Sequence, residues 1–350
     1  MNEFDLIKKY FSSFSAGFNI EEGIGDDCAL VNIPKGETLA ISTDTLVENI
    51  HFFKDVDPYS LGFKSLAVNI SDLAAMGAKP LGFTLALTLP DINENFLEKF
   101  SKGLLDLAKI ENIPLIGGDT TKGPLSITIT VLGSVDKLKA FKRKNAQEND
   151  NIYVSGLLGG ASLGVAIRYK KESVDKKSQE RAFKRLDYPI ARTQIVDYLK
   201  NNNISCALDL SDGLISDLNH ILNLSDKYAL ININDLPFDS ALESLPIDKK
   251  LKYALSGGED YELCFCGKLK EDKTQITHQN FYIESFKLKT NLDLCEKNLP
   301  ITKIGKIITF DEFNEIIKKH PENNRVYGRI VLVGDEVTTI PHNLSGFSHF

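Results

Sequence analysis

The sequence lacks the features that define several large classes of protein. It has no uninterrupted apolar run of about 18 residues, which a membrane-spanning helix needs, and residues 1–19 contain no apolar stretch of the signal-peptide type. Its cysteines form no CxxC pair and no Cys/His metal pattern; they are Cys28, Cys206, Cys264, Cys266 and Cys295. We therefore expect a cytoplasmic protein with reduced thiols and no membrane partner.

Two further absences concern phosphate-bearing ligands. No G-x-x-x-x-G-K-[ST] motif is present, so a Walker-type loop is not the means of binding a nucleotide. The net charge of −7 and the pI near 5.5 argue against a nucleic-acid surface, because such surfaces are basic. A bound cation could still supply the positive charge that an anionic substrate needs.

The chain has 350 residues, which is enough for about two domains, and its 42% hydrophobic content is that of a globular protein. Strands alternate with helices in both halves, which predicts an α/β or α+β fold. A polar stretch at 138–151 suggests a boundary between domains 1–140 and 150–350. The expected strands are 38–42, 83–89, 113–116, 126–133, 151–155 and 207–210, and one that contains Phe265; the expected helices are 58–76, 93–109, one after the glycine-rich turn 156–164, and one that ends near Leu224.

One local pattern recurs along the chain. Short apolar strands run directly into turns of Gly, Ser or Thr that carry aspartates, at 23–27, 42–44, 117–119 and 209–213. On the helix 58–76, Ser65, Asn69 and Asp72 share one face through their i, i+4, i+7 spacing. A single turn of this kind is usually only a turn, but several aspartates at strand ends can converge on one rim. Because Mg²⁺ prefers carboxylate and phosphate oxygens, the set predicts a site for magnesium and phosphate.

The same motifs resemble the thiamine-monophosphate kinase family. The matching stretches, in order, are GIGDDCAL (23–30), STDTLVENIHF (42–52), KSLAVNISDLAAMGAKP (64–80), LIGGDTTKGPLSITIT (115–130), LDLSDGLISDLNHI (208–221), LSGGEDYELCF (255–265) and the terminal GFSHF (346–350). The resemblance covers nearly the whole chain, except for 170–184 and 268–298.

This resemblance implies a fold, a reaction and a set of partners. The fold is that of the aminoimidazole ribonucleotide synthetase superfamily, with an N-terminal domain that pairs across a homodimer and a C-terminal α/β domain. The reaction moves the γ-phosphoryl group of ATP onto the phosphate of thiamine monophosphate, giving thiamine diphosphate and ADP. ATP is then a co-substrate, several Mg²⁺ ions take part, and no nucleic acid is involved.

The resemblance also implies roles for individual residues. No residue is assigned as a general base. The magnesium positions are Asp27, Ser42, Thr43, Asp44, Asp72, Asp119, Asp209 and Asp212, with Asp26 as a helper. The nucleotide contacts are Gly118, Asp119, Arg143 and Ser211, and the contacts to thiamine monophosphate are His51, Glu259 and Phe347.

The sequence departs from the family pattern at three places. Lys122 stands where Arg is usual, Asn49 stands where Gly is common, and the stretch 144–146 after Arg143 lacks the usual Gly. Two alternatives therefore stay open. A sister synthetase would use the same metal chemistry on another acceptor, although Cys28 follows Asp27 in the wrong context for a selenophosphate synthetase. A non-catalytic nucleotide sensor would tolerate loss of the aspartates, all of which are retained.

Overall fold

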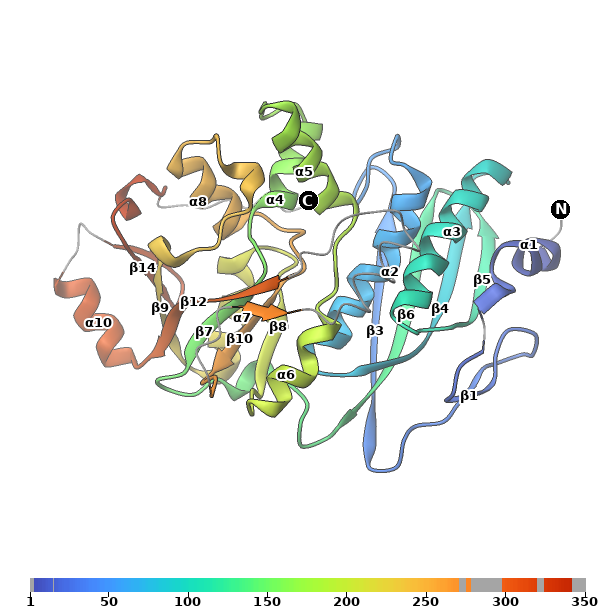
Figure 1. Ribbon diagram of the computed structural model, residues 1–350, viewed down its shortest axis with the longest axis horizontal. Helices are drawn as coiled ribbons and strands as arrows, with labels where there is room; N and C mark the ends of the chain where they lie inside the picture. The colour runs from blue at the N-terminus through green and yellow to red at the C-terminus, as the bar shows by residue number, and fades with distance from the viewer. Residues whose placement is uncertain (1–2, 15, 271–274, 278–297, 320–323, 342–350) are drawn as a thin grey trace. The chain divides into compact units, whose positions relative to one another are not determined.

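The computed structural model describes residues 3–14, 16–270, 275–277, 298–319 and 324–341. Phe347 and Cys295 lie outside these residues. The described chain divides into two compact units, one within Met1–Ala140 and one formed by Phe141–Thr277 and the described residues from Asn298 onward. Both units mix helices with sheets (Figure 1), which confirms the fold class expected from the sequence.

The first unit is built on a four-stranded sheet in the order β3-β6-β4-β5. The pairing is antiparallel except between β4 and β5, which are parallel. Strands β3 and β5 are therefore the two edges of this sheet. The strands are β3 (Glu37–Val47), β4 (Lys79–Leu89), β5 (Leu115–Lys122) and β6 (Ser126–Asp136), and a small hairpin of β1 (Ile20–Glu22) and β2 (Leu30–Val31) precedes them.

Two strands are longer than the sequence predicts. Ser42-Thr43-Asp44 and Gly117-Gly118-Asp119 were expected in turns after strands, but both lie inside strands. Strand β3 continues because it pairs with β6 over its full length, and Thr43 and Thr45 meet Thr130 and Thr128 across the strands at 2.8 and 2.9 Å. These aspartates are thus held by a sheet and not by flexible turns.

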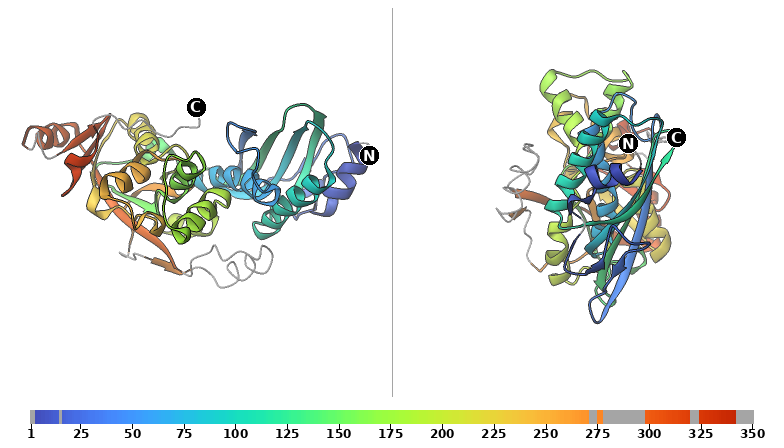
Figure 2. Two further views of the ribbon diagram at one scale, coloured as in Figure 1. Left: turned by 90° about the horizontal axis from the view of Figure 1, so that it is seen from above. Right: turned by 90° about the vertical axis from the view of Figure 1, so that its right-hand side faces the viewer.

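Helices α2 (Pro58–Ala75) and α3 (Glu94–Ile110) pack side by side on the same face of this sheet (Figure 2), and α1 (Glu3–Tyr10) contacts α3. Both long helices begin as the sequence predicts. Asp57 caps α2 by accepting a hydrogen bond from the Ser60 amide at 3.1 Å, and Asn93 caps α3 in the same way. Leu66, Ile70 and Leu73 of α2 are fully buried, and the helix packs against β3 and β6 of the sheet.

The backbones of α2 and α3 approach each other at two glycines. A Cβ atom on Gly62 would lie 2.0 Å from the Phe100 carbonyl oxygen, and one on Gly103 would lie 1.9 Å from that of Tyr59. No side chain fits at either position without moving a helix. This contact fixes the position of α2, which carries Asn69 and Asp72.

We therefore expect Gly103→Ala to destabilise the protein by about 3 kcal/mol, because overpacking against backbone cannot be relieved by a rotamer change. The matched control is Lys99→Ala on the exposed side of the same helix, which should change the free energy of unfolding by about 0.5 kcal/mol or less. Urea denaturation of both variants measures the difference. Equal stabilities would contradict the close helix packing.

The second unit contains an eight-stranded sheet in the order β13-β14-β9-β12-β7-β10-β8, with β11 paired to β12. Its pairs are antiparallel except for β14 with β9. Strands β8 and β10 lie side by side, so the segments that follow β8 and precede β10 meet at one end of the sheet. The strands are β7 (Asn151–Ser155), β8 (Cys206–Asp209), β9 (Tyr228–Asn232), β10 (Leu263–Gly267), β11 (Gln275–Thr277), β12 (Asn298–Ile308), β13 (Arg325–Tyr327) and β14 (Ile330–Val333).

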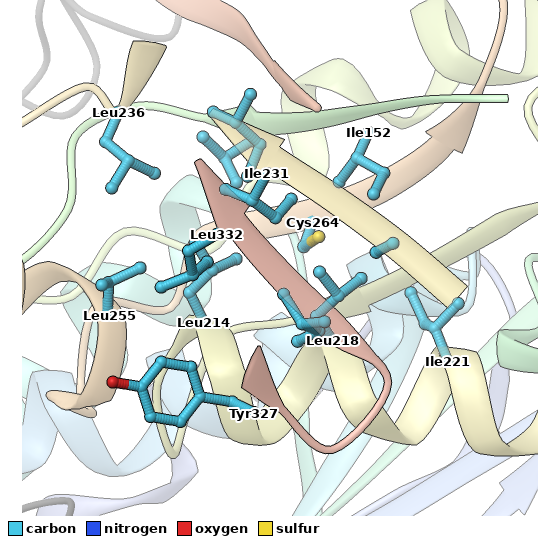
Figure 3. Close-up of a cluster of buried hydrophobic side chains, with 14 of the residues drawn as sticks. Ile152, Leu214, Leu218, Ile221, Ile231, Leu236, Leu255, Cys264, Tyr327 and Leu332 are labelled. Carbon is cyan, nitrogen blue, oxygen red and sulfur yellow. The ribbon is translucent and has the colours of Figure 1, made fainter. Parts of the chain in front are cut away.

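Helices cover both faces of this sheet. Helices α7 (Leu214–Ser225) and α8 (Ile247–Ser256) bury Leu214, Leu218 and Leu255 against inward-facing strand residues such as Ile231 and Leu332 (Figure 3). Helix α10 (Phe310–Lys319) packs on the other face through Phe313. The remaining helices are α4 (Gly160–Arg168), α5 (Lys176–Asp187) and α6 (Val196–Asn201).

Two expectations about the chain as a whole can be compared with the structure. No helix among the described residues is long and apolar enough to cross a membrane. The four cysteines that the structure describes are free thiols, three of them buried.

Candidate functional site

The first group of predicted site residues joins strand β3 to helix α2. The Ser42 hydroxyl donates to the Asp72 carboxylate at 2.5 Å, and the Asp44 amide donates to the Asn69 side-chain oxygen at 3.1 Å. Asn69 is itself buried and donates to the Ser65 carbonyl. The helix face predicted from the spacing of Ser65, Asn69 and Asp72 therefore faces β3 and holds Asp44 beside Asp72.

The two carboxylates of this group repel each other. Partial burial, together with the neighbouring Asp72 charge, raises the pKa of Asp44 to about 6. Ser42 donates to the Asp72 carboxylate and Asn69 accepts from the Asp44 backbone, so both contacts hold the pair in place and neither cancels its charge. A divalent cation would cancel it.

The second group lines a pocket of about 640 Å³ at the β5 edge of the same sheet. The exposed Asp26 and Asp27 lie on one wall, and Gly118 and Asp119 of β5 form another. Asp26 accepts a hydrogen bond from the Asp27 amide at 2.8 Å, which fixes the turn. Ile7, Phe11, Leu85, Leu115 and Ile116 give the pocket an apolar side.

These two groups are far apart within one chain. Asp44 pairs with Ile129, Ile129 with Leu85, and Leu85 with Gly118, so that three strand spacings, roughly 14 Å, separate Asp44 from the residue next to Asp119. Among the described residues, no three His, Cys, Asp or Glu side chains converge as a ready-made metal cage. The predicted ligands thus form separate small groups.

The third group lies in the second unit, where β8 ends and α7 begins. Asp209 is the last residue of β8 and is buried, whereas Asp212 is exposed. The side chain of Asp217, in the first turns of α7, accepts hydrogen bonds from the Asp212 and Gly213 amides, both at 3.0 Å. Burial and the charges of Asp212 and Asp209 raise the pKa of Asp217 to about 7.

The predicted substrate residue Glu259 lies against this third group. Its amide donates to the Ser211 carbonyl at 2.9 Å, and its φ angle of 74° is in the left-handed region. Glu259 is largely buried, and its loop leads directly into β10. The structure therefore brings the segment of Asp209, Ser211 and Asp212 together with Glu259, whereas the roles assigned to these residues stay predictions.

Three other predicted residues have different surroundings. Arg143 is exposed, and its carbonyl accepts from the Cys206 thiol at the start of β8, about 10 Å of strand away from Asp209. His51 accepts a hydrogen bond from the Val47 amide at Nδ1, which leaves its Nε2 as the protonated nitrogen of the neutral ring. Phe347 lies outside the described residues.

The structure explains one departure from the family pattern. Asn49 has a φ angle of 64° in the turn between Val47 and His51. Asparagine is the residue that best replaces glycine in this left-handed conformation. The turn that positions His51 therefore takes a conformation that suits glycine although the glycine is absent.

The glycine-rich segment 156–164, which loosely resembles a phosphate loop in sequence, is expected to be a turn before a helix, but α4 already begins at Gly160. The amides at the start of this helix are bonded by the protein itself. The Asp260 carboxylate accepts the Gly159 amide at 2.7 Å and approaches the Ala161 amide at 3.5 Å, at the start of α4. Burial raises the pKa of Asp260 to about 7, although Arg185 opposes the shift. Its place in the sequence beside Glu259 indicates that Asp260 supports that residue, but its bond to the Gly159 amide is seen only in the folded unit, as are the bonds that Asp217 accepts.

Comparisons with known proteins address the identity of the chain. Residues 25–135 match the family model described as AIR synthase related protein, N-terminal domain. Thiamine-monophosphate kinase of Escherichia coli O157:H7 is 51% identical over 269 residues, which cover 75% of this chain and 82% of the relative. The chain belongs to the thiamine-monophosphate kinase family. The resemblance found in the sequence is thereby confirmed.

Solved structures of thiamine-monophosphate kinases share the fold. The enzyme from Stenotrophomonas maltophilia K279a superposes with a TM-score of 0.71 at 37% identity, covering 83% of this chain and 89% of that one. AaThiL complexed with AMPPCP and TMP superposes with a TM-score of 0.65 at 27% identity, covering 82% and 85%. The expected synthetase-like fold is confirmed by these matches.

The residues present fit a magnesium site of the thiamine-monophosphate kinase type. Mg²⁺ commonly takes only one or two protein carboxylates and completes its shell with water and substrate phosphates. The Asp44–Asp72 pair and the exposed Asp26, Asp27 and Asp119 offer oxygen donors of this kind. Small carboxylate groups, without a closed cage, are what such shared coordination requires.

The Asp44–Asp72 pair gives a test that needs no substrate. Because the folded-state pKa of Asp44 lies above the unfolded value, the folded protein binds more protons, and stability falls as pH rises from about 4 to 6. We expect Asp44→Asn to raise the metal-free Tm at pH 7.5 by about 2–4 °C, the shift that about 1 kcal/mol produces. Thermal unfolding with and without Mg²⁺ should also show a smaller stabilisation by Mg²⁺ in the variant.

The matched control for this test is Asp55→Asn, an exposed carboxylate of the same unit. Its Tm and its response to Mg²⁺ should equal those of the unmodified protein. If Asp44→Asn kept the full stabilisation by Mg²⁺ at pH 7.5, Asp44 would not be a metal ligand.

Proposed function

We propose that this protein transfers the γ-phosphoryl group of ATP to the phosphate of thiamine monophosphate, yielding thiamine diphosphate and ADP. The observation that carries the proposal is membership of the thiamine-monophosphate kinase family at 51% identity. A relative with the same fold is complexed with AMPPCP, an ATP analogue, and TMP. The free thiols fit the cytoplasm as the site of this reaction.

The reaction needs positioning and charge neutralisation more than acid–base chemistry. An oxygen of the acceptor phosphate attacks the γ-phosphorus in line, and the bond to the bridging β–γ oxygen breaks to release ADP. That acceptor oxygen is already a nucleophile, so we assign no general base. Ser211 and Gly118 would contact the nucleotide, and Arg143 would approach it from the start of β8.

Charge is the main obstacle, because both reactants are anions and the site is lined with carboxylates. The carboxylates would hold Mg²⁺, and the bound cation would supply the positive charge that offsets this repulsion. The residues that would hold the ions are Asp26, Asp27, Ser42, Thr43, Asp44, Asp72, Asp119, Asp209 and Asp212. The strand and helix contacts of Asp44 and Asp72 keep these donors in place before the ions bind.

The acceptor would be recognised by His51 and Glu259, with Phe347 as a third contact. Nε2–H of His51 is suited to donate to the substrate phosphate. The Glu259 carboxylate is suited to the positively charged thiazolium ring of thiamine, because opposite charges attract strongly in a partly buried site.

We infer further that the working form is a homodimer whose site combines two chains. Asp44 and Asp119 lie on strands at opposite edges of one sheet, although both are assigned to the same reaction. Long open edges such as β3 and β5 are stabilised when another strand covers them. Placing β3 of one protomer near the partner's β5 would bring the two aspartates to one site.

The direct test of the activity uses purified protein with ATP, Mg²⁺ and either thiamine monophosphate or thiamine. We expect thiamine diphosphate from the monophosphate alone, measured by chromatography. Asp119→Asn should reduce turnover by at least about a hundredfold without loss of folding, because removal of one charge-stabilising group from a phosphoryl-transfer site costs several kcal/mol. Turnover of selenide or of an aminoimidazole precursor, with no thiamine diphosphate formed, would instead identify a sister synthetase.

The composite site can be tested by mixing two inactive variants. In a heterodimer of Asp44→Asn and Asp119→Asn, one site carries both substitutions and the other carries neither. Unfolding and refolding the variants together should then restore about a quarter of the unmodified activity, since half of the dimers are mixed and each has one intact site. No recovery, with mixed dimers demonstrated by mass spectrometry, would place both aspartates of one site in a single chain.

A further inference from the structure

Two loops of the second unit are joined through their backbones. One is Leu210–Gly213, assigned to the nucleotide and metal, and the other is Gly257–Glu262, assigned to the acceptor. The Glu259 amide donates to the Ser211 carbonyl and the Tyr261 amide to the Leu210 carbonyl, both at 2.9 Å. The Leu210 amide returns a bond to the Glu262 carbonyl at 2.8 Å. A Cβ on Gly258 would lie 2.3 Å from the Ser211 carbonyl oxygen, so the backbones of the two loops are in direct contact.

The backbone conformation of the acceptor loop, Gly257–Glu262, is unfavourable by itself and needs contacts with other segments to hold it. Glu259 and Tyr261 have φ angles of 74° and 49°, which are unfavourable for residues with a Cβ atom. Asp260 lies between them, and its side chain points away from the loop to the start of α4, where it bonds the Gly159 amide. The buried Asp260 carboxylate therefore fastens this strained segment to a helix.

Asp260 interacts with a network of buried charges formed by Glu262 and two arginines. The fully buried Glu262 accepts hydrogen bonds from the Ser155 hydroxyl at 2.7 Å, from Arg185 at 2.8 Å and from Arg192 at 2.6 Å. These arginines hold the pKa of Glu262 below its usual value despite its burial. Arg185 also interacts with Asp260, so the residues on either side of Tyr261 are held by the same group.

We propose that Asp260 is a positioning residue that holds the nucleotide loop and the acceptor loop as one rigid element. Its bond to the start of α4 sets the backbone of Glu259 and Tyr261, and their amides in turn set Ser211 and Leu210. Recognition of the two substrates is therefore coupled through Asp260, although its carboxylate contacts neither. The kinetic part of this inference rests on the proposed function; the structural part does not.

The variant Asp260→Ala tests both parts. Amide hydrogen exchange should accelerate by at least about tenfold at Glu259, Tyr261 and Gly159 together, because they share one anchor. The KM values for ATP and for thiamine monophosphate should both rise by about tenfold. Asp260→Asn, which keeps one acceptor oxygen for the Gly159 amide, should show the same joint changes at about threefold.

The matched control is Asp175→Ala. Asp175 caps α5 in the same unit by accepting the Ser178 amide at 3.1 Å, but it is exposed and contacts neither loop. It should lower the Tm while leaving both KM values and the exchange at Glu259 and Tyr261 unchanged.

The proposal is overturned if the Asp260 variants, like the control, lower only the Tm. A rise in one KM without the other would also contradict it, because the loops would then move independently. If the Ala variant does not fold, the Asn variant decides by the same readings. If the unmodified protein shows no kinase activity, the proposed function fails, and the exchange data still decide whether Asp260 holds the loops.

Discussion

The repulsion between neighbouring carboxylates is the physical constraint on which the candidate site depends. Asp44 and Asp72 lie close enough for the pKa of Asp44 to rise to about 6, and yet the fold brings them together. Three contacts keep the pair in place: Ser42 donates to the Asp72 carboxylate, the Asp44 amide donates to Asn69, and the tight packing of α2 on α3 prevents the helix from moving away. Under the proposed function, a bound cation would offset this repulsion.

Glu262 in the second unit has surroundings opposite to those of Asp44. Glu262 is fully buried, but two arginines and a serine satisfy it, and its pKa is lowered. The contrast gives a physical criterion for separating two kinds of acidic residue. A carboxylate with counter-charges in the protein, such as Glu262, maintains the fold, whereas one whose charged neighbour is another carboxylate, such as Asp44, is suited to a ligand of positive charge.

The sequence predicted those features that local chemistry determines. The start of α2 follows from Asp57 and Pro58, and the shared face of Asn69 and Asp72 follows from helical spacing; both are as expected. The lengths of β3 and β5 were underestimated, because strand ends depend on partners distant in sequence. The sequence indicates only that Asp260 supports Glu259; the partner of its carboxylate, the Gly159 amide, lies 101 residues away and could not be predicted for the same reason. The ligand roles themselves rest on family motifs and stay predictions.

The hydrogen bonds at the N-termini of α4 and α7 give a reason why the proposed phosphate binding would depend on metal. A helix N-terminus is a common phosphate site, because its amides are unpaired and its dipole attracts anions. Here the amides before α7 bond to Asp217, and those at the start of α4 bond to Asp260. Both glycine-containing turns are thus occupied by internal carboxylates and cannot cradle a phosphate as a Walker loop does. Under the proposed function, the positive charge that faces the two phosphate-bearing substrates would come from Arg143 and from cations held by exposed aspartates such as Asp212.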